Sequence, residues 1–165
     1  MDMKNVYLEY RCPRWEDFPE IELYMDQVVS ILENSLEIFS RNEKIITPAM
    51  INNYVKQKIV KPPVNKKYDR VHLAYFMVVC IFKQFMTISE ICDAIAFLMK
   101  KYTVKELYNI FCEELENALK CTFDPESCNT ASKDTNNETR VIRAAAFTFS
   151  NLAYAKYIVN NGKEA

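Results

Sequence analysis

The residues best suited to bind a ligand lie between Thr47 and Arg70, where amide and lysine side chains occur at short spacing. Asn52, Asn53 and Lys56 share one side of a helix, because successive helical residues turn by about 100°. An asparagine amide can both donate to and accept from the edge of adenine, and a lysine can donate to guanine or to a phosphate oxygen. These residue types therefore offer recognition of a nucleic-acid surface.

The stretch around these side chains is strongly basic. From Lys44 to Tyr68 it contains six lysines and no acid, whereas the whole chain has a net charge of −1. Residues 1–43 carry ten acids and four bases, and residues 44–86 carry one acid and eight bases. A basic centre in an acidic chain indicates a local polyanion-binding face. The side chains that we predict to contact DNA are Asn52, Asn53, Lys56, Lys58, Lys61, Lys66, Lys67 and Arg70.

A short helix is expected to hold the asparagines. Thr47 can cap its first turn, and Pro48 suits the first helical position. We expect the helix to end near Gln57, with Lys58 just beyond the end in a left-handed conformation that usually favours glycine. The prolines at positions 62 and 63 then predict a stiff extended segment.

This combination has two interpretations. A helix with a small polar face followed by a stiff basic segment suits a groove-reading helix and its wing. A solvated surface helix followed by an ordinary basic loop is the other interpretation. The stretch alone does not separate them.

Capping signals and apolar periodicity predict the remaining helices. Met1–Arg14 shows no clear period and is expected to form an arm. Potential capping residues precede four of the predicted helices, and Asn161-Gly162 would end the last one. The predicted helices are Glu20–Phe39 after Asp17, Arg70–Phe85 after Asp69, one starting after Thr87, one starting after Thr103, and Glu138–Asn160.

The fold class that follows is all-α, a helix bundle containing a winged helix-turn-helix with a short wing and extra C-terminal helices. The single glycine in the chain also argues against hairpins and phosphate-binding loops. We expect residues 1–121 to form one helical domain. Residues 122–137, rich in Asp, Asn, Ser and Thr, would be a linker loop, and residues 138–165 a C-terminal helix.

Several motifs resemble known families. Ile51-Asn52-Asn53-Tyr54, Ile59-Val60 and Tyr68 are similar to the helix and wing of MerR-type winged helix-turn-helix regulators, whose fold and DNA binding this resemblance implies. The stretch from Pro13 to about Glu114 resembles an uncharacterised Gram-positive bacterial family catalogued as a domain of unknown function. That likeness rests on Pro13-Arg14-Trp15-Glu16, Leu23-Tyr24-Met25-Asp26, Thr47-Pro48 and His72-Leu73-Ala74-Tyr75. It implies no established activity.

The sequence offers few groups for catalysis. His72 is the only histidine, and the six cysteines include no C-x-x-C pair, so local spacing supplies no metal site. We predict no enzyme activity, no catalytic residue and no cofactor. We also expect free thiols, a cytoplasmic location and no membrane segment.

Our functional prediction is a MerR-like DNA-binding transcriptional regulator that binds double-stranded DNA. The alternative is a protein-interaction or scaffold module that keeps the winged-helix fold without binding DNA. A homodimer is expected because residues 141–159 are apolar on all sides of their helix, and one bundle would not cover every side. The sequence identifies neither an operator nor a small-molecule effector.

Overall fold

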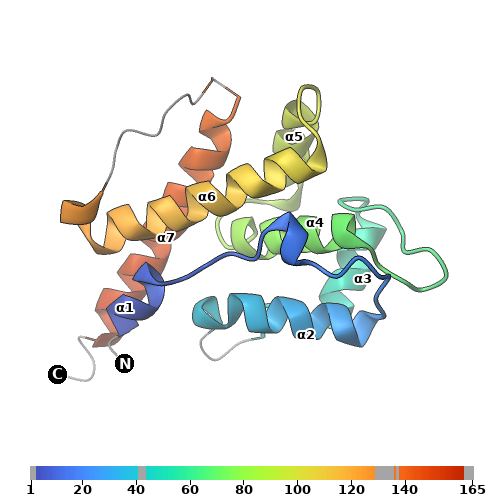
Figure 1. Ribbon diagram of the computed structural model, residues 1–165, viewed down its shortest axis with the longest axis horizontal. Coiled ribbons are helices and arrows are strands. Elements are labelled where there is room, and N and C mark those ends of the chain that lie inside the picture. The colour runs from blue at the N-terminus through green and yellow to red at the C-terminus, as the bar shows by residue number, and fades with distance from the viewer. Residues whose placement is uncertain (1–2, 41–43, 129–135, 137, 162–165) are drawn as a thin grey trace. The chain divides into compact units, whose positions relative to one another are not determined.

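The computed structural model describes residues 3–40, 44–128, 136 and 138–161 of the chain, and the described part is helical (Figure 1). Its backbone pairing outside helices is limited to two isolated antiparallel bridges, which join Leu23 to Tyr68 and Val64 to Lys67. The all-α prediction is therefore confirmed. The helices are α1 (Met3–Leu8), η1 (Trp15–Asp17), α2 (Met25–Leu36), η2 (Glu37–Phe39), α3 (Pro48–Lys56), α4 (Arg70–Phe82), α5 (Ile88–Leu98), α6 (Val104–Phe123), η3 (Pro125–Ser127) and α7 (Arg140–Asn161).

The chain divides into two compact units. Pro13–Asn109 form the central unit, and Met1–Cys12 with Ile110–Ala165 form the terminal unit. One boundary therefore falls inside α6. This division differs from the expected one into residues 1–121, 122–137 and 138–165. Helix α6 continues to Phe123 and η3 follows it, while residues 129–135 and 137 of the expected linker lie outside the described residues.

The predicted helix starts at Thr47, Asp69, Thr87 and Thr103 are confirmed. The Thr47 side chain accepts a hydrogen bond from the Met50 amide, and the Asp69 side chain accepts one from the His72 amide. At Thr87 and Thr103 a glutamate three residues later completes a reciprocal capping box. These caps satisfy amides that the first helical turn leaves without intrahelical partners.

The prediction of a helix from Glu20 to Phe39 is wrong at its start. The Asp17 carboxylate accepts from the Arg14 amide and so belongs to η1. Leu23 is held in extended backbone by its bridge to Tyr68, and α2 begins only after Tyr24. A partner 45 residues away thus prevents the expected early start.

Three other boundaries differ from expectation. The predicted arm contains α1. Helix α4 ends at Phe82 rather than Phe85, and residues 83–85 form turns. Helix α7 begins at Arg140, two residues after the predicted Glu138, and Thr139 is tied to Asn136 before it. The predicted stop at Gly162 lies outside the described residues.

Helix α4 forms the core of the central unit. Nine of its thirteen residues are buried, and α2 packs against both α4 and α3 (Figure 1). The Tyr54 ring of α3 reaches the Phe76 ring of α4. Helix α2 contributes Val28, Leu32 and Leu36, and α3 contributes Ile51 and Tyr54. Each large apolar side chain of this kind stabilises the fold by about 1.5–3 kcal/mol when fully buried. Helices α2 and α4 therefore give α3 a firm support.

In the terminal unit, α6 and α7 each bury a row of apolar side chains. Phe111, Leu115 and Leu119 are buried on α6, and Ile142 and Phe149 on α7. The Ser150 hydroxyl donates to the Ala118 carbonyl, which joins the two helices by a buried hydrogen bond. None of the helices in the described residues combines the length and apolar character that crossing a membrane requires.

The expectation that all thiols are free is wrong for one pair. Cys121, in the last turn of α6, forms a disulfide with Cys128, just after η3. Cys12, Cys80, Cys92 and Cys112 are not part of a disulfide. Six residues separate Cys121 from Cys128, so no C-x-x-C spacing marks this pair. The short helix η3 between the two cysteines turns the chain back far enough for their sulfurs to meet.

Candidate nucleic-acid interface

Helix α3 separates its polar and apolar residues cleanly. Ile51 and Tyr54 are 0% exposed, whereas Asn52, Asn53 and Lys56 are exposed. Thr47 and Pro48 start the helix where the sequence predicts. The two amides and the lysine therefore lie on one accessible face, as helical spacing requires.

A Schellman motif ends α3. The Ile59 amide donates to the Tyr54 carbonyl, the Lys58 amide donates to the Val55 carbonyl, and Lys58 has a φ of 59°. The predicted helix end and the predicted left-handed Lys58 are both confirmed. Ile59 and Val60 are buried directly after this turn, so the chain leaves α3 in a fixed direction.

The stretch that follows α3, residues 57–68, is called the basic segment here. It contains a tight turn in which Asn65 has a φ of 50° and Lys66 a φ of 62°. Val64 and Lys67 exchange two backbone hydrogen bonds of 2.9 and 3.2 Å across this turn. Positive φ at both central residues is the requirement of a type I′ hairpin turn, where Asn-Gly is the favoured pair. Lys66 occupies the glycine position and is exposed.

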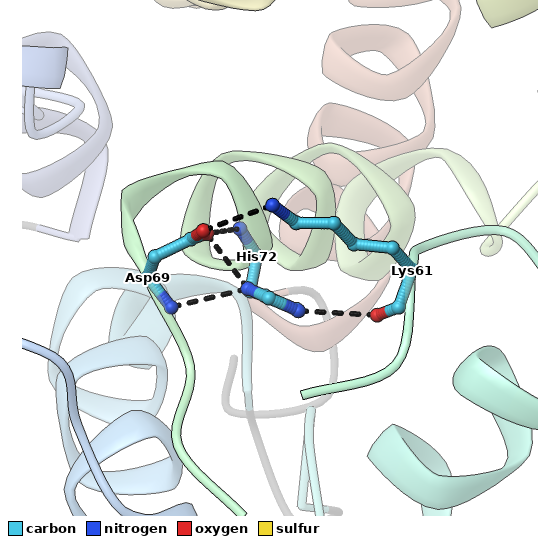
Figure 2. Close-up of polar contacts among 3 residues, drawn as sticks. All are labelled: Lys61, Asp69 and His72. Atoms are coloured by element: carbon cyan, nitrogen blue, oxygen red, sulfur yellow. Dashed lines mark hydrogen bonds and ion pairs between the residues drawn. The ribbon is translucent and has the colours of Figure 1, made fainter. Parts of the chain in front are cut away.

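His72 ties the basic segment to the start of α4 (Figure 2). Its Nε2 lies 3.1 Å from the Lys61 carbonyl oxygen, and its Nδ1 lies 2.7 Å from Asp69 Oδ1. The ring is 1% exposed and meets the edge of the Tyr68 ring. The only histidine of the chain is therefore fully engaged in holding the backbone at Lys61.

Asp69 receives three partners at this junction. Besides the His72 amide and ring, the Lys61 ammonium lies 3.1 Å from its Oδ2 (Figure 2). Burial acts to raise the pKa of Asp69. The hydrogen bonds from the His72 amide, the Lys61 ammonium and the His72 ring outweigh burial and leave that pKa below its ordinary value. The carboxylate is thus the stable form in the folded protein.

A second attachment holds the far end of the basic segment. Leu23 and Tyr68 exchange two backbone hydrogen bonds of 2.8 Å, and Tyr68 is buried. The Lys67 ammonium lies 5.6 Å from the centroid of the Tyr24 ring, a cation–π distance. With these contacts and the His72 contact, the segment is fixed at both ends of its turn.

Arg70 is used inside the protein. Its Nε and one terminal nitrogen donate to the Phe18 carbonyl at 2.9 and 2.7 Å, and it lies 3.6 Å from Glu20. Its predicted contact with a DNA backbone is therefore not supported by its surroundings. The guanidinium instead secures the stretch before α2. The sequence held no local signal for this, because Phe18 is 52 residues away.

The structure brings most of the other predicted residues together on α3 and the basic segment. Lys67 and Arg70 are half-buried, and the remaining six are exposed. Among the described residues, no cluster of His, Cys, Asp and Glu is arranged to hold a metal ion. The exposed residues are Asn52, Asn53, Lys56, Lys58, Lys61 and Lys66.

Comparison with known proteins gives one positive finding. Residues 13–111 match the model of a family described as "Domain of unknown function (DUF1836)". No curated protein and no solved structure matches the chain. The resemblance to MerR-type regulators gains no support from these comparisons. The match spans most of the chain and contains every residue of the candidate interface, so the chain belongs to the DUF1836 family.

Proposed function

We propose that this protein is a transcriptional regulator that binds double-stranded DNA, with α3 as the reading helix and the basic segment as a short wing. The observation that carries the proposal is the backbone at Lys58 and Lys66. Both lysines have positive φ and both are exposed. A side chain with a Cβ costs about 1–2 kcal/mol there, and strain of this kind concentrates at functional sites.

The charges around α3 support the same function. No acid occurs between Lys44 and Tyr68, and the first acid after this stretch, Asp69, is paired with Lys61 and His72. The exposed ammonium groups of Lys56, Lys58 and Lys66, which form no ion pair within the described part of the chain, would contact phosphates. The amides of Asn52 and Asn53 would read base edges in the major groove.

The resemblance to MerR-type heads also supports the arrangement as a winged helix-turn-helix. Lys58 stands where those heads have a helix-ending glycine, and its φ of 59° is the conformation that such a glycine would adopt. The backbone at Lys58 therefore forms the turn that ends the helix in those heads, although a lysine and not a glycine occupies the position.

One observation favours the second candidate, a protein-interaction module. Tyr24 is 55% exposed and Val64 is 62% exposed. The Lys67 ammonium lies over the Tyr24 ring, and the Lys67 backbone pairs with that of Val64. A surface made of Tyr24, Val64 and Lys67 offers two apolar side chains beside one positive charge. Such a surface would suit an acidic, partly apolar protein segment better than a phosphate backbone.

The DNA proposal is tested by selecting genomic fragments with the purified protein and measuring the affinity for the selected fragment against salt. If two chains together neutralise about eight phosphates, log affinity should fall with log salt at a slope near −7. The double variant Lys58→Gly, Lys66→Gly keeps the backbone and removes two charges per chain. It should flatten the slope by about two for each chain that contacts DNA.

Two controls complete the test. Lys120→Ala removes a charge from α6 and should leave the slope unchanged. Asn53→Ala should alter the selected sequence more than the slope, because base contacts specify and phosphate contacts position. Absence of any retarded complex at low salt would reject DNA binding and leave the interaction module.

A further inference from the structure

Helix α5 is rich in apolar residues, but few of its side chains are buried. Glu90 and Asp93 are the only charged residues among its eleven, yet Ile91 and Leu98 are its only buried ones. Phe97 is 48% exposed, and Met99, directly after the helix, is 38% exposed. A helix of this composition normally buries a broader face, so part of α5 is available to a partner.

The outward side of α5 carries a stripe of four exposed residues, Asp93, Ala96, Phe97 and Lys100. Spacings of three and four residues place them on one face, away from the buried Ile91 and Leu98. The Tyr102 amide donates to the Leu98 carbonyl, so the helical path continues through Lys100. Neither Asp93 nor Lys100 takes part in an ion pair among the described residues.

We propose that this stripe is a self-association surface on which α5 packs antiparallel against α5 of a second copy of the chain. A two-fold axis between Ala96 and Phe97 sets Asp93 of each copy level with Lys100 of the other. The same axis brings the two Phe97 rings together. The small Ala96 side chains let the backbones approach on the other side of the axis. The stripe is thus complementary to itself in charge and in shape, as an isologous interface requires.

The sequence alone favoured α7 as the dimer helix, and α7 does leave Tyr154, Ile158 and Val159 exposed. However, α7 carries Arg140, Arg143 and Lys156 and no acid. Two antiparallel copies of α7 would therefore set only like charges along their contact. Helix α5 with the turn after it has an acid at one end and a base at the other, so charge complementarity selects α5.

The test is sedimentation equilibrium of the full chain without DNA, over a range of protein concentrations, so its result does not depend on the proposed function. We expect a reversible dimer. Asp93→Lys and Lys100→Asp should each weaken it by at least about tenfold, because each creates two like-charge contacts in the symmetric interface. The double variant Asp93→Lys, Lys100→Asp restores both pairs with reversed sign and should recover dimerisation.

Controls separate this interface from a general charge effect. Glu113→Lys makes the same charge change at an exposed position on α6 and should leave the dimer unchanged. Phe97→Ser should abolish the dimer while the helical circular dichroism signal is retained. A chain that stays monomeric at every concentration would overturn the proposal. So would a dimer indifferent to Asp93→Lys, or a double variant that fails to recover dimerisation.

Discussion

Lys58 adopts a backbone conformation that glycine would adopt without strain. Its φ of 59° places Cβ close to the neighbouring carbonyl, so Lys58→Gly should raise the free energy of unfolding by up to about 1 kcal/mol. The measurement is the urea midpoint at an unchanged slope. Asn53→Gly, at an exposed position inside α3, is the matched control and should instead cost up to about 1 kcal/mol. Equal destabilisation by both variants would contradict the left-handed turn at Lys58.

Tyr54 carries a hydroxyl without a hydrogen-bond partner in the described part of the structure, although the residue is 0% exposed. A buried polar atom without a partner costs about 1–3 kcal/mol relative to water. Tyr54→Phe removes the hydroxyl and keeps the ring against Phe76. The variant should match or exceed the wild-type urea midpoint. A clear loss of stability would mean that the hydroxyl is satisfied in solution.

At the scale of the element, the cap of α4 should make stability depend on pH. The pKa of Asp69 is lowered in the folded protein, so its carboxylate stabilises the fold above the ordinary aspartate value of about 4. That stabilisation is lost as the pH falls through the lower folded pKa. Asp69→Ala should therefore cost about 1–2 kcal/mol at pH 7 and progressively less in acid.

The control for this prediction is Thr47→Ala at the start of α3. Its hydroxyl cap does not titrate over this range, so the cost of losing it should stay constant with pH. Urea midpoints of the two variants and the wild type, measured from pH 7 to pH 3, make the comparison. A pH-independent cost at Asp69 would contradict the assigned ionic contacts.

The elements that sequence predicts well are those whose signals are local. The caps at Thr47, Thr87 and Thr103 and the turn at Lys58 depend on residues within a few positions of one another. The features it missed depend on distant partners. Leu23 delays α2 by pairing with Tyr68, and Arg70 leaves the predicted interface to hold the Phe18 carbonyl. Periodicity and capping rules carry no information about such partners.

In the candidate interface, too, features set by nearby residues were predictable and features set by distant residues were not. The exposed amides on α3 were predictable because helical spacing alone decides their face. The contact of His72 with the Lys61 carbonyl was not predictable, because it depends on how the basic segment folds between these two residues. The Asp69-to-His72 spacing of three residues, which is a capping-box spacing, was the one available signal.

At the scale of the whole molecule, the Cys121–Cys128 disulfide closes the end of α6. Cys128→Ser should lower the free energy of unfolding by about 2–3 kcal/mol, the size expected for a short closed loop. Cys92→Ser, at a half-buried free thiol, should cost less. Thermal melting compares the variants. Alkylation of the denatured chain should modify four cysteines before reduction and all six after it.

The stretch that precedes α2 in the central unit also has an optical consequence. Trp15 is the only tryptophan in the chain, and its amide donates to the Asn109 side chain. Tyr108 nearby donates to the Pro13 carbonyl, and the Lys105 ammonium lies 2.5 Å from Glu16. Indole fluorescence of the unlabelled protein therefore reports on one place, where residues 13–18 meet the first turns of α6. Its emission would follow the release of that attachment separately from the far-ultraviolet signal of the helices.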